Sequence, residues 1–198
     1  FYSNHEVNKI LNIENLNKKF KLPGTKKLLN AVDDLSFSLK EGEILGIAGE
    51  SGSGKTTVAN LLMGLLEGNS GQITFINKDI NQYLKYEKKN FRKNIQMVFQ
   101  DPYGSLNPRK TIGTTLSLAI KIHFKLNEDE TKNKVFELLE KVELTPPEVF
   151  YERHPHELSG GQQQRVAIAR AISTEPKLII SDEAVASLDM SIRSEILK

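Results

Sequence analysis

The sequence predicts an α/β domain with an inserted helical region, and three observations lead to that prediction. A glycine-rich loop, residues 49–57, lies between an apolar run and a helical pattern. A later apolar run, residues 177–181, ends in two acidic residues. Between these elements, about residues 101–157 carry mainly helical periodicity. The expected organisation is therefore a core of residues 1–100 and 158–198, with about residues 101–157 as the insert.

Two segments before the glycine-rich loop alternate apolar and polar residues, which is typical of strands with one buried face. They cover residues 10–16 and 31–39, and Pro23 and Gly24 mark a turn between them. Residues 44–48 are apolar throughout and predict a buried strand that leads into the loop.

A helix and a short strand follow the loop. Residues 55–66 predict the helix, and Gly68 predicts its end. Residues 72–76 predict the strand. The lysine-rich run 83–92 favours a solvated helical face over a nucleic-acid surface, because it does not interleave arginine and aromatic residues at a groove.

The second half alternates strands with longer helices. Asn127 is a predicted N-cap followed by acidic residues, and Pro146 with Pro147 ends the helix that it begins. The predicted strands are 95–99 and 177–181, and the predicted helices are 111–122, 128–142, 159–173 and a last one from Met190.

Length and composition limit the functional classes. The chain has 198 residues, a net charge of +2 and no cysteine, which suits one domain without disulfides or thiol chemistry. No apolar run approaches the roughly 18–20 residues that span a bilayer. Because the chain begins at Phe1 and stops inside a helical pattern, we expect a single domain truncated at its C-terminus.

Residues 49–57 match the phosphate-binding pattern G-x-x-x-x-G-K-[ST]. Glycines let successive N–H groups curve around phosphates, and the helix N-terminus adds a positive dipole end. Lys55 can neutralise the β and γ oxygens, and the Thr56 hydroxyl can ligate Mg²⁺. The alternative, a glycine–serine turn followed by a lysine, does not explain the flanking strand and helix patterns. The predicted nucleotide-binding residues here are Gly49, Glu50, Ser51, Gly52, Ser53, Gly54, Lys55, Thr56 and Thr57.

The apolar run at residues 177–181 ends in Asp182 and Glu183. An aspartate at the carboxyl end of a strand can hold Mg²⁺ directly or through water. The adjacent glutamate can polarise an attacking water as a general base. A simple acidic turn is the alternative, which the phosphate loop upstream disfavours. His154 and His156 have no further ligands near them in sequence, so no metal site is predicted there.

The segment Leu158-Ser159-Gly160-Gly161-Gln162 resembles the signature of ATP-binding-cassette (ABC) ATPases. The resemblance implies that Ser159, Gly160, Gly161 and Gln162 act on the ATP held by a second subunit. It also implies that Gln100 senses Mg²⁺ and the γ-phosphate, and that Phe20 stacks on adenine. Ser187 and Asp189 lie in a loop similar to the one that reaches across the family's dimer.

Residues 99–109, 31–37 and 154–159 resemble the oligopeptide/dipeptide-importer branch of this family. The resemblance implies an ATPase that uses ATP and Mg²⁺ to power a bacterial importer at the cytoplasmic face of the membrane. Its expected partners are an identical or paralogous ATPase subunit, transmembrane permease subunits and, indirectly, a substrate-binding protein, with no nucleic acid. Alanine at 184, where many relatives have proline, is a departure that this branch tolerates.

Two other functions stay open at the sequence level. One is a soluble ABC ATPase acting on ribosomes or DNA, although such proteins usually carry tandem cassettes or long coiled-coil inserts. The other is a nucleotide-dependent interaction module without hydrolysis. The transported substrate does not follow from these residues.

Overall fold

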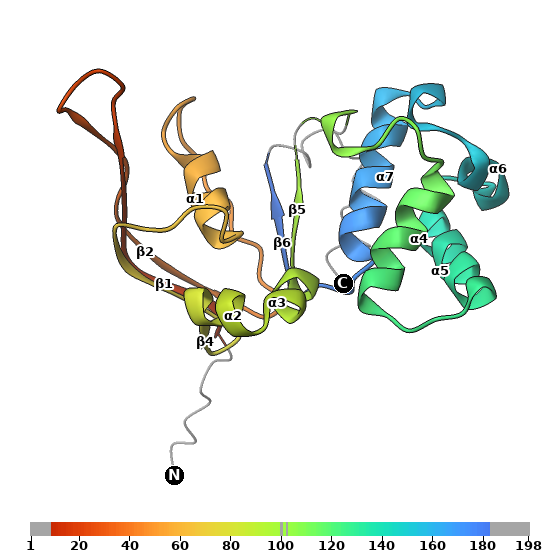
Figure 1. The fold of residues 1–198 in the computed structure, drawn as a ribbon, viewed down its shortest axis with the longest axis horizontal. Helices are drawn as coiled ribbons and strands as arrows, with labels where there is room; N and C mark the ends of the chain where they lie inside the picture. Colours follow the sequence, from red (N-terminus) through yellow and green to blue (C-terminus); the bar gives the residue numbers. More distant parts are fainter. Residues whose placement is uncertain (1–8, 100, 102, 183–198) are drawn as a thin grey trace, which may run out of the picture. The chain divides into compact units, whose positions relative to one another are not determined.

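The computed structural model describes residues 9–99, 101 and 103–182 (Figure 1). The chain divides into two compact units, Phe1–Phe91 and Arg92–Lys198. The predicted division into a core and a helical insert stays a prediction. Gln100, Glu183, Ser187, Asp189 and the helix predicted from Met190 lie outside the described residues.

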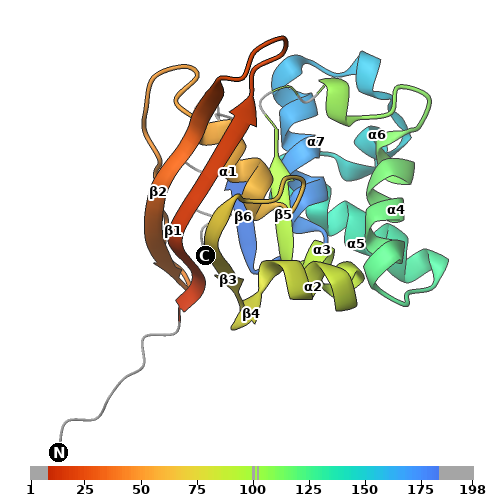
Figure 2. The ribbon, with the colours of Figure 1, turned by 60° about the vertical axis from the view of Figure 1, so that its left-hand side comes forward.

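The first unit contains a four-stranded antiparallel sheet in the order β2-β1-β3-β4 (Figure 2). β1 (Lys9–Lys21) and β2 (Leu28–Lys40) form a long hairpin. β3 (Ser70–Phe75) pairs with the other edge of β1, and the short β4 (Lys78–Asp79) pairs with β3. This sheet confirms the predicted alternating segments as strands.

Alternation along β1 buries Leu11 and Ile13, and Leu16 is buried as well after a register shift in the hairpin. Beyond Leu16 the hairpin continues through register shifts, with Phe20 opposite Leu29. The strands are therefore longer than predicted, because backbone pairing persists where side chains are exposed and the apolar alternation has stopped.

Three aromatic rings connect the sheet to the helices that follow β4. Phe75 packs edge-on against Phe91 at 6.1 Å, and Tyr83 packs edge-on against Phe91 at 5.4 Å. These rings come from β3, α2 (Ile80–Tyr86) and α3 (Lys88–Asn94), the last of which crosses the boundary between the units. The lysine-rich run is thus largely helical, and it buries Tyr83 and Phe91 in the core while Tyr86 stays exposed.

The helix after the phosphate loop, α1 (Lys55–Leu62), is shorter than the predicted 55–66. Gly64, at φ 61°, leaves the right-handed helical region, and the N–H groups of Leu65 and Leu66 both donate to the Asn60 carbonyl. The prediction that Gly68 ends this helix was therefore wrong, because a left-handed glycine stops it four positions earlier.

The predicted buried strand at residues 44–48 was also wrong. These residues have no strand geometry and are exposed; Ile44, for example, is 67% accessible. A strand needs a backbone partner, and none of the described strands pairs with this segment. An apolar run identifies a segment that favours burial, but it does not supply that partner.

The second unit contains a parallel pair, β5 (Ile95–Val98) and β6 (Leu178–Ser181), in the register Ile95 to Leu178. Both strands fall within one residue of their predicted ranges. The α-helices of this unit beyond α3 are α4 (Ile112–His123), α5 (Glu128–Lys141), α6 (Pro147–Glu152) and α7 (Gly160–Ile172).

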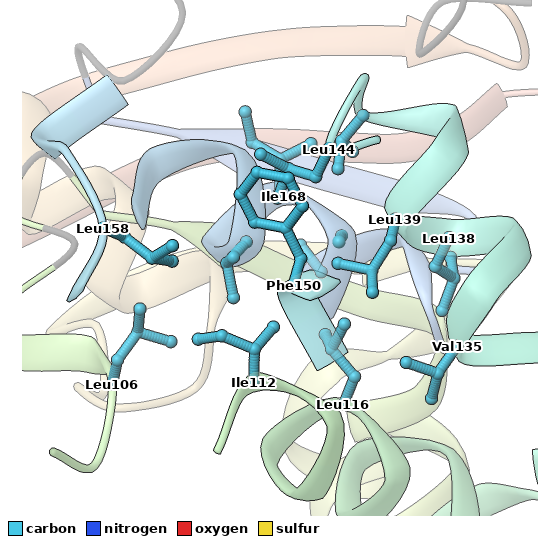
Figure 3. Packing of buried hydrophobic residues seen from close by; sticks show 14 of the residues in the cluster. Leu106, Ile112, Leu116, Val135, Leu138, Leu139, Leu144, Phe150, Leu158 and Ile168 are labelled. Carbon is cyan, nitrogen blue, oxygen red and sulfur yellow. The ribbon is translucent and has the colours of Figure 1, made fainter. Parts of the chain in front are cut away.

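These helices pack around one apolar core (Figure 3). Ile112, Leu116, Leu139 and Val166 are fully buried within it. Neighbouring members are Leu106, Val135, Leu138, Leu144, Phe150, Leu158 and Ile168. Because α7 shares this core with α4, α5 and α6, the start of α7 is held by the packing of all four helices.

Local signals explain where the helices begin. Asn127 caps α5 through a capping box with Glu130, which confirms the predicted N-cap. The prediction that Pro146 and Pro147 end α5 was wrong, because α5 already ends at Lys141 and Glu143 is left-handed at φ 57°. Pro147 instead occupies the first turn of α6, a short helix that was not predicted. Over the described stretches of the chain, none of the helices has the length and apolarity needed to cross a bilayer.

Candidate functional site

The phosphate loop ends at Gly54, which is the N-cap of α1. Gly54 has φ +94°, and a Cβ there would lie 2.1 Å from the Ala31 carbonyl oxygen of β2. Glycine is therefore required both by the left-handed backbone and by the close approach of the hairpin. Gly52 is also left-handed, at φ +80°, but its Cβ would meet open space. The loop thus reaches the helix N-terminus in a conformation that L side chains rarely adopt.

The Lys55 ammonium is held by the backbone of its own loop. Its Nζ donates to the carbonyl oxygens of Gly49 at 2.6 Å and Glu50 at 2.8 Å. The N–H of Ser53 donates to the Glu50 carbonyl at 3.1 Å and closes the turn. A flexible cation bound to neutral carbonyls can exchange them for phosphate oxygens, which make stronger charge-assisted bonds. The predicted role of Lys55 stays a prediction.

Phe20 lies near the end of β1, half-buried, with the Lys18 ammonium 5.1 Å from its ring centroid. Ala31, which approaches Gly54, lies two residues beyond Leu29, the pairing partner of Phe20. The hairpin thus brings the stretch that carries Phe20 to the side of the phosphate loop. Stacking of Phe20 on adenine stays a prediction.

Asp182 follows β6 at the carboxyl edge of the parallel pair. The N–H of Asp182 donates to the Val98 carbonyl at 3.1 Å, so Asp182 lies beside the end of β5. Its carboxylate is partly exposed. Gln100 and Glu183 come shortly after these two strand ends in sequence, outside the described residues. Asp182 therefore lies at the carboxyl ends of the parallel strands, which is where proteins with parallel sheets bind their ligands.

Ser159 caps α7 through a capping box with Gln162. The Ser159 N–H donates to the Gln162 side chain at 3.0 Å, and the Gln162 N–H donates to the Ser159 hydroxyl at 3.3 Å. Gly160 and Gly161 are exposed, and a Cβ at either would meet nothing within 4 Å. Packing within the described residues therefore does not require glycine at either position, while the helix start stays open to an approaching anion.

Gln163 was not predicted, yet it fixes the segment before this helix. It is only 4% exposed, and its Nε2 donates to the carbonyls of Pro155 at 2.8 Å and Leu158 at 3.3 Å. Helical spacing was the available signal, because Gln163 falls on the same face as the buried Val166 and Ala167.

Two ionic groups support the same region. The Glu157 carboxylate accepts from the His154 N–H at 2.6 Å, and that bond lowers the pKa of Glu157. The Arg170 guanidinium donates to the Ser105 carbonyl, and burial lowers the pKa of Arg170. His154 and His156 stack with ring centroids 5.6 Å apart.

Across the described residues, no group of three or more His, Asp or Glu side chains is arranged to hold a metal ion. The proposed ligands Thr56 and Asp182 belong to different units, and Gln100 is not described. The donor chemistry nevertheless suits Mg²⁺, because a hydroxyl, a carboxylate and an amide oxygen are the hard ligands that this ion prefers.

Comparison with known proteins gives consistent matches. The family profile described as "ABC transporter" matches residues 32–186. The oligopeptide transport ATP-binding protein AppF of Bacillus subtilis is 50% identical over 171 residues, covering 85% of this chain and 51% of AppF. The glutathione import ATP-binding protein GsiA of Escherichia coli K12 is 42% identical over 193 residues, covering 95% of this chain and 31% of GsiA.

A solved structure matches the fold as a whole. The dimeric ATP-binding cassette MJ0796, in a post-hydrolysis state with ADP and Pi, superposes with a TM-score of 0.80 at 31% identity. The match covers 94% of this chain and 79% of that one. The chain spans 51% of AppF and 31% of GsiA, so these relatives contain long stretches outside the comparison.

Proposed function

Because this chain belongs to the ABC transporter family, we propose that it binds and hydrolyses ATP to power a bacterial importer of oligopeptides or dipeptides. The observation that carries the proposal is the phosphate loop, whose Gly54 gives the left-handed start of α1. AppF, an oligopeptide transport protein by name, supports the peptide class. GsiA, named for glutathione import, supports a small peptide-like cargo equally well.

ATP is proposed to bind with its phosphates on residues 49–57 and its adenine against Phe20. Lys55 leaves the loop carbonyls and neutralises the β and γ oxygens. Thr56, Asp182 and Gln100 are proposed to hold Mg²⁺, which when bound neutralises phosphate charge. The main-chain N–H groups at the start of α1 contribute further positive partial charge.

Glu183 is proposed to align and polarise the water that attacks the γ-phosphate. The second half of the site is proposed to come from another ATPase subunit, identical or paralogous. Ser159, Gly160, Gly161 and Gln162 would then serve the ATP of that subunit, because the open start of α7 can receive an anion. The dimer of MJ0796 supports this arrangement by similarity.

Coupling to transport is proposed to run through the segment at residues 105–111 to transmembrane permease subunits, with a substrate-binding protein acting from the other side. The chain is accordingly proposed to act at the cytoplasmic face of the membrane. Co-purification with ribosomes or DNA in place of permease subunits would instead favour the soluble ABC ATPase. ATP binding without turnover in the complete assembly would favour the interaction module.

The decisive experiment is ATP hydrolysis and ATP binding by the full-length protein in its assembled complex. Glu183→Gln is expected to retain ATP binding and lose hydrolysis, since the amide cannot accept the water's proton. Glu152→Gln, an exposed change on α6, is the matched control and should match the wild type. Unchanged turnover in Glu183→Gln would refute the general-base role.

Lys55→Ala tests the phosphate loop itself. We expect it to abolish measurable ATP binding, because the loop loses its only side-chain cation among residues 49–57. Lys40→Ala, at the exposed end of β2, is the control for removing a lysine. Wild-type affinity in Lys55→Ala would argue against the whole site.

A further inference from the structure

The stretch of β1 just before Phe20 is bound to the segment that follows α1. The Lys18 ammonium donates to the Glu67 carbonyl at 2.7 Å. The N–H of Lys19 donates to the Asn69 side-chain oxygen at 2.6 Å, and the Asn69 N–H donates to the Asn17 carbonyl at 2.8 Å. Three hydrogen bonds therefore join the approach to Phe20 with the exit from the helix that the phosphate loop begins.

The same hairpin also touches the beginning of that helix. Ala31, which lies opposite the step from Lys18 to Lys19 in the register, places its carbonyl against Gly54. The hairpin thus contacts both ends of the segment from Gly54 to Asn69. Any displacement of Phe20 relative to the phosphate loop must strain one of these contacts.

Lys18 acts on the Phe20 ring as well as on the backbone. Its ammonium lies 5.1 Å from the ring centroid while it donates to the Glu67 carbonyl. A cation on one face of an aromatic ring is held by the ring quadrupole. One ammonium therefore contacts the Phe20 ring and also ties this stretch of β1 to the segment after α1.

We propose that Lys18 and Asn69 are positioning residues that set the Phe20 ring at the distance from the phosphate loop that a purine nucleotide requires. This inference rests on the proposed function, because it assumes that Phe20 stacks on the base. The proposal is that recognition of the base depends on Phe20 and also on the hydrogen bonds that join Lys18 and Asn69 to their partners. A ligand without a base should be insensitive to that network.

The test compares the dissociation constants of MgATP and of magnesium tripolyphosphate by calorimetry, using the full-length protein. Lys18→Met keeps the length of the side chain and removes its charge. We expect about five- to tenfold weaker ATP binding, from one lost cation–π contact and one lost hydrogen bond. Tripolyphosphate binding should change by less than about twofold.

Lys19→Met is the matched control, because the Lys19 side chain is exposed on the same strand and only its main-chain N–H, which methionine keeps, belongs to the network. It should bind both ligands like the wild type. Lys18→Arg should restore ATP binding, since a guanidinium can also lie on the ring and donate to a carbonyl. Asn69→Ala should weaken ATP binding selectively, whereas Asn69→Asp, which keeps the acceptor, should retain it.

A Phe20→Ala variant distinguishes the adenine-stacking role of Phe20 from the positioning role of Lys18 and Asn69. If Phe20→Ala leaves ATP binding intact, the adenine role of Phe20 fails, and the positioning role fails with it. If Phe20→Ala weakens ATP but Lys18→Met behaves like Lys19→Met, only the positioning role fails. Equal losses of ATP and tripolyphosphate in Lys18→Met would also overturn it, because they would indicate a damaged phosphate loop.

Discussion

Gly161→Ala separates the requirements of folding from those of catalysis. Gly161 lies in the first turn of α7, is exposed, and has no atom within 4 Å of the position a Cβ would take. An added methyl group therefore meets no neighbour and reduces the entropy of the unfolded chain. We expect the free energy of unfolding to rise by about 0.4–1 kcal/mol.

The same methyl group should lower ATP hydrolysis in the assembled transporter. It occupies the open space at the start of α7, which we propose a nucleotide phosphate approaches from a second subunit. Loss of close approach to one phosphate oxygen is expected to reduce turnover at least about tenfold, or about 1.4 kcal/mol in the barrier. Unfolding in urea gives the first quantity, and phosphate release by the purified complex gives the second.

Glu137→Ala is the control, because Glu137 is exposed on α5 and forms no ion pair with any of the described residues. Its stability should stay within about 0.5 kcal/mol of the wild type, with unchanged turnover. A destabilised Gly161→Ala would show that the space is not open. Wild-type turnover in a stabilised Gly161→Ala would refute the proposed approach of a nucleotide to this helix.

Three further changes test local features of the fold. Gly54→Ala should lose nucleotide binding and at least about 1–2 kcal/mol of the free energy of unfolding, measured by urea denaturation. Gly52 is also left-handed, but a Cβ there meets no atom, so Gly52→Ala should lose only the free energy needed to hold alanine in a left-handed conformation. Asn127→Ala should lower the free energy of unfolding by about 1 kcal/mol in the same assay, through the lost capping box. The pKa of Glu157 is lowered in the folded state, so its contribution to stability is present above its unfolded pKa and declines as pH falls toward the folded value. In Glu157→Gln, which still leaves the N–H of His154 an acceptor, that pH-dependent part should disappear when unfolding is followed across the acid range.

Local chemistry explains why much of the fold was predictable. Asn127, the glycine-rich loop and the apolar strands β5 and β6 each act through neighbours in sequence or through a strong burial preference. A local signal of the same kind explains why Ser159 is the N-cap of α7, where it forms a capping box with Gln162. These features need no knowledge of what packs against them.

Features set by distant contacts were not predictable in the same way. Residues 44–48 are as apolar as β5, but strand formation also needs a backbone partner, which composition does not encode. Gln163 looks polar in the sequence, and its burial follows from carbonyls five and eight residues away. The bond from Lys18 to the Glu67 carbonyl joins residues 49 positions apart.

The glycine at the end of the phosphate loop and the glycines at the start of α7 are subject to different physical constraints. Gly54 cannot be replaced without strain, because its backbone is left-handed and the Ala31 carbonyl fills the place of a Cβ. Gly160 and Gly161 have neither constraint, and glycine in a helix is less stable than alanine by up to about 1 kcal/mol. Their use is therefore unexplained by the folding of the described residues. It is explained if the space above them receives a phosphate from another subunit, and the stability and turnover of Gly161→Ala measure that difference directly.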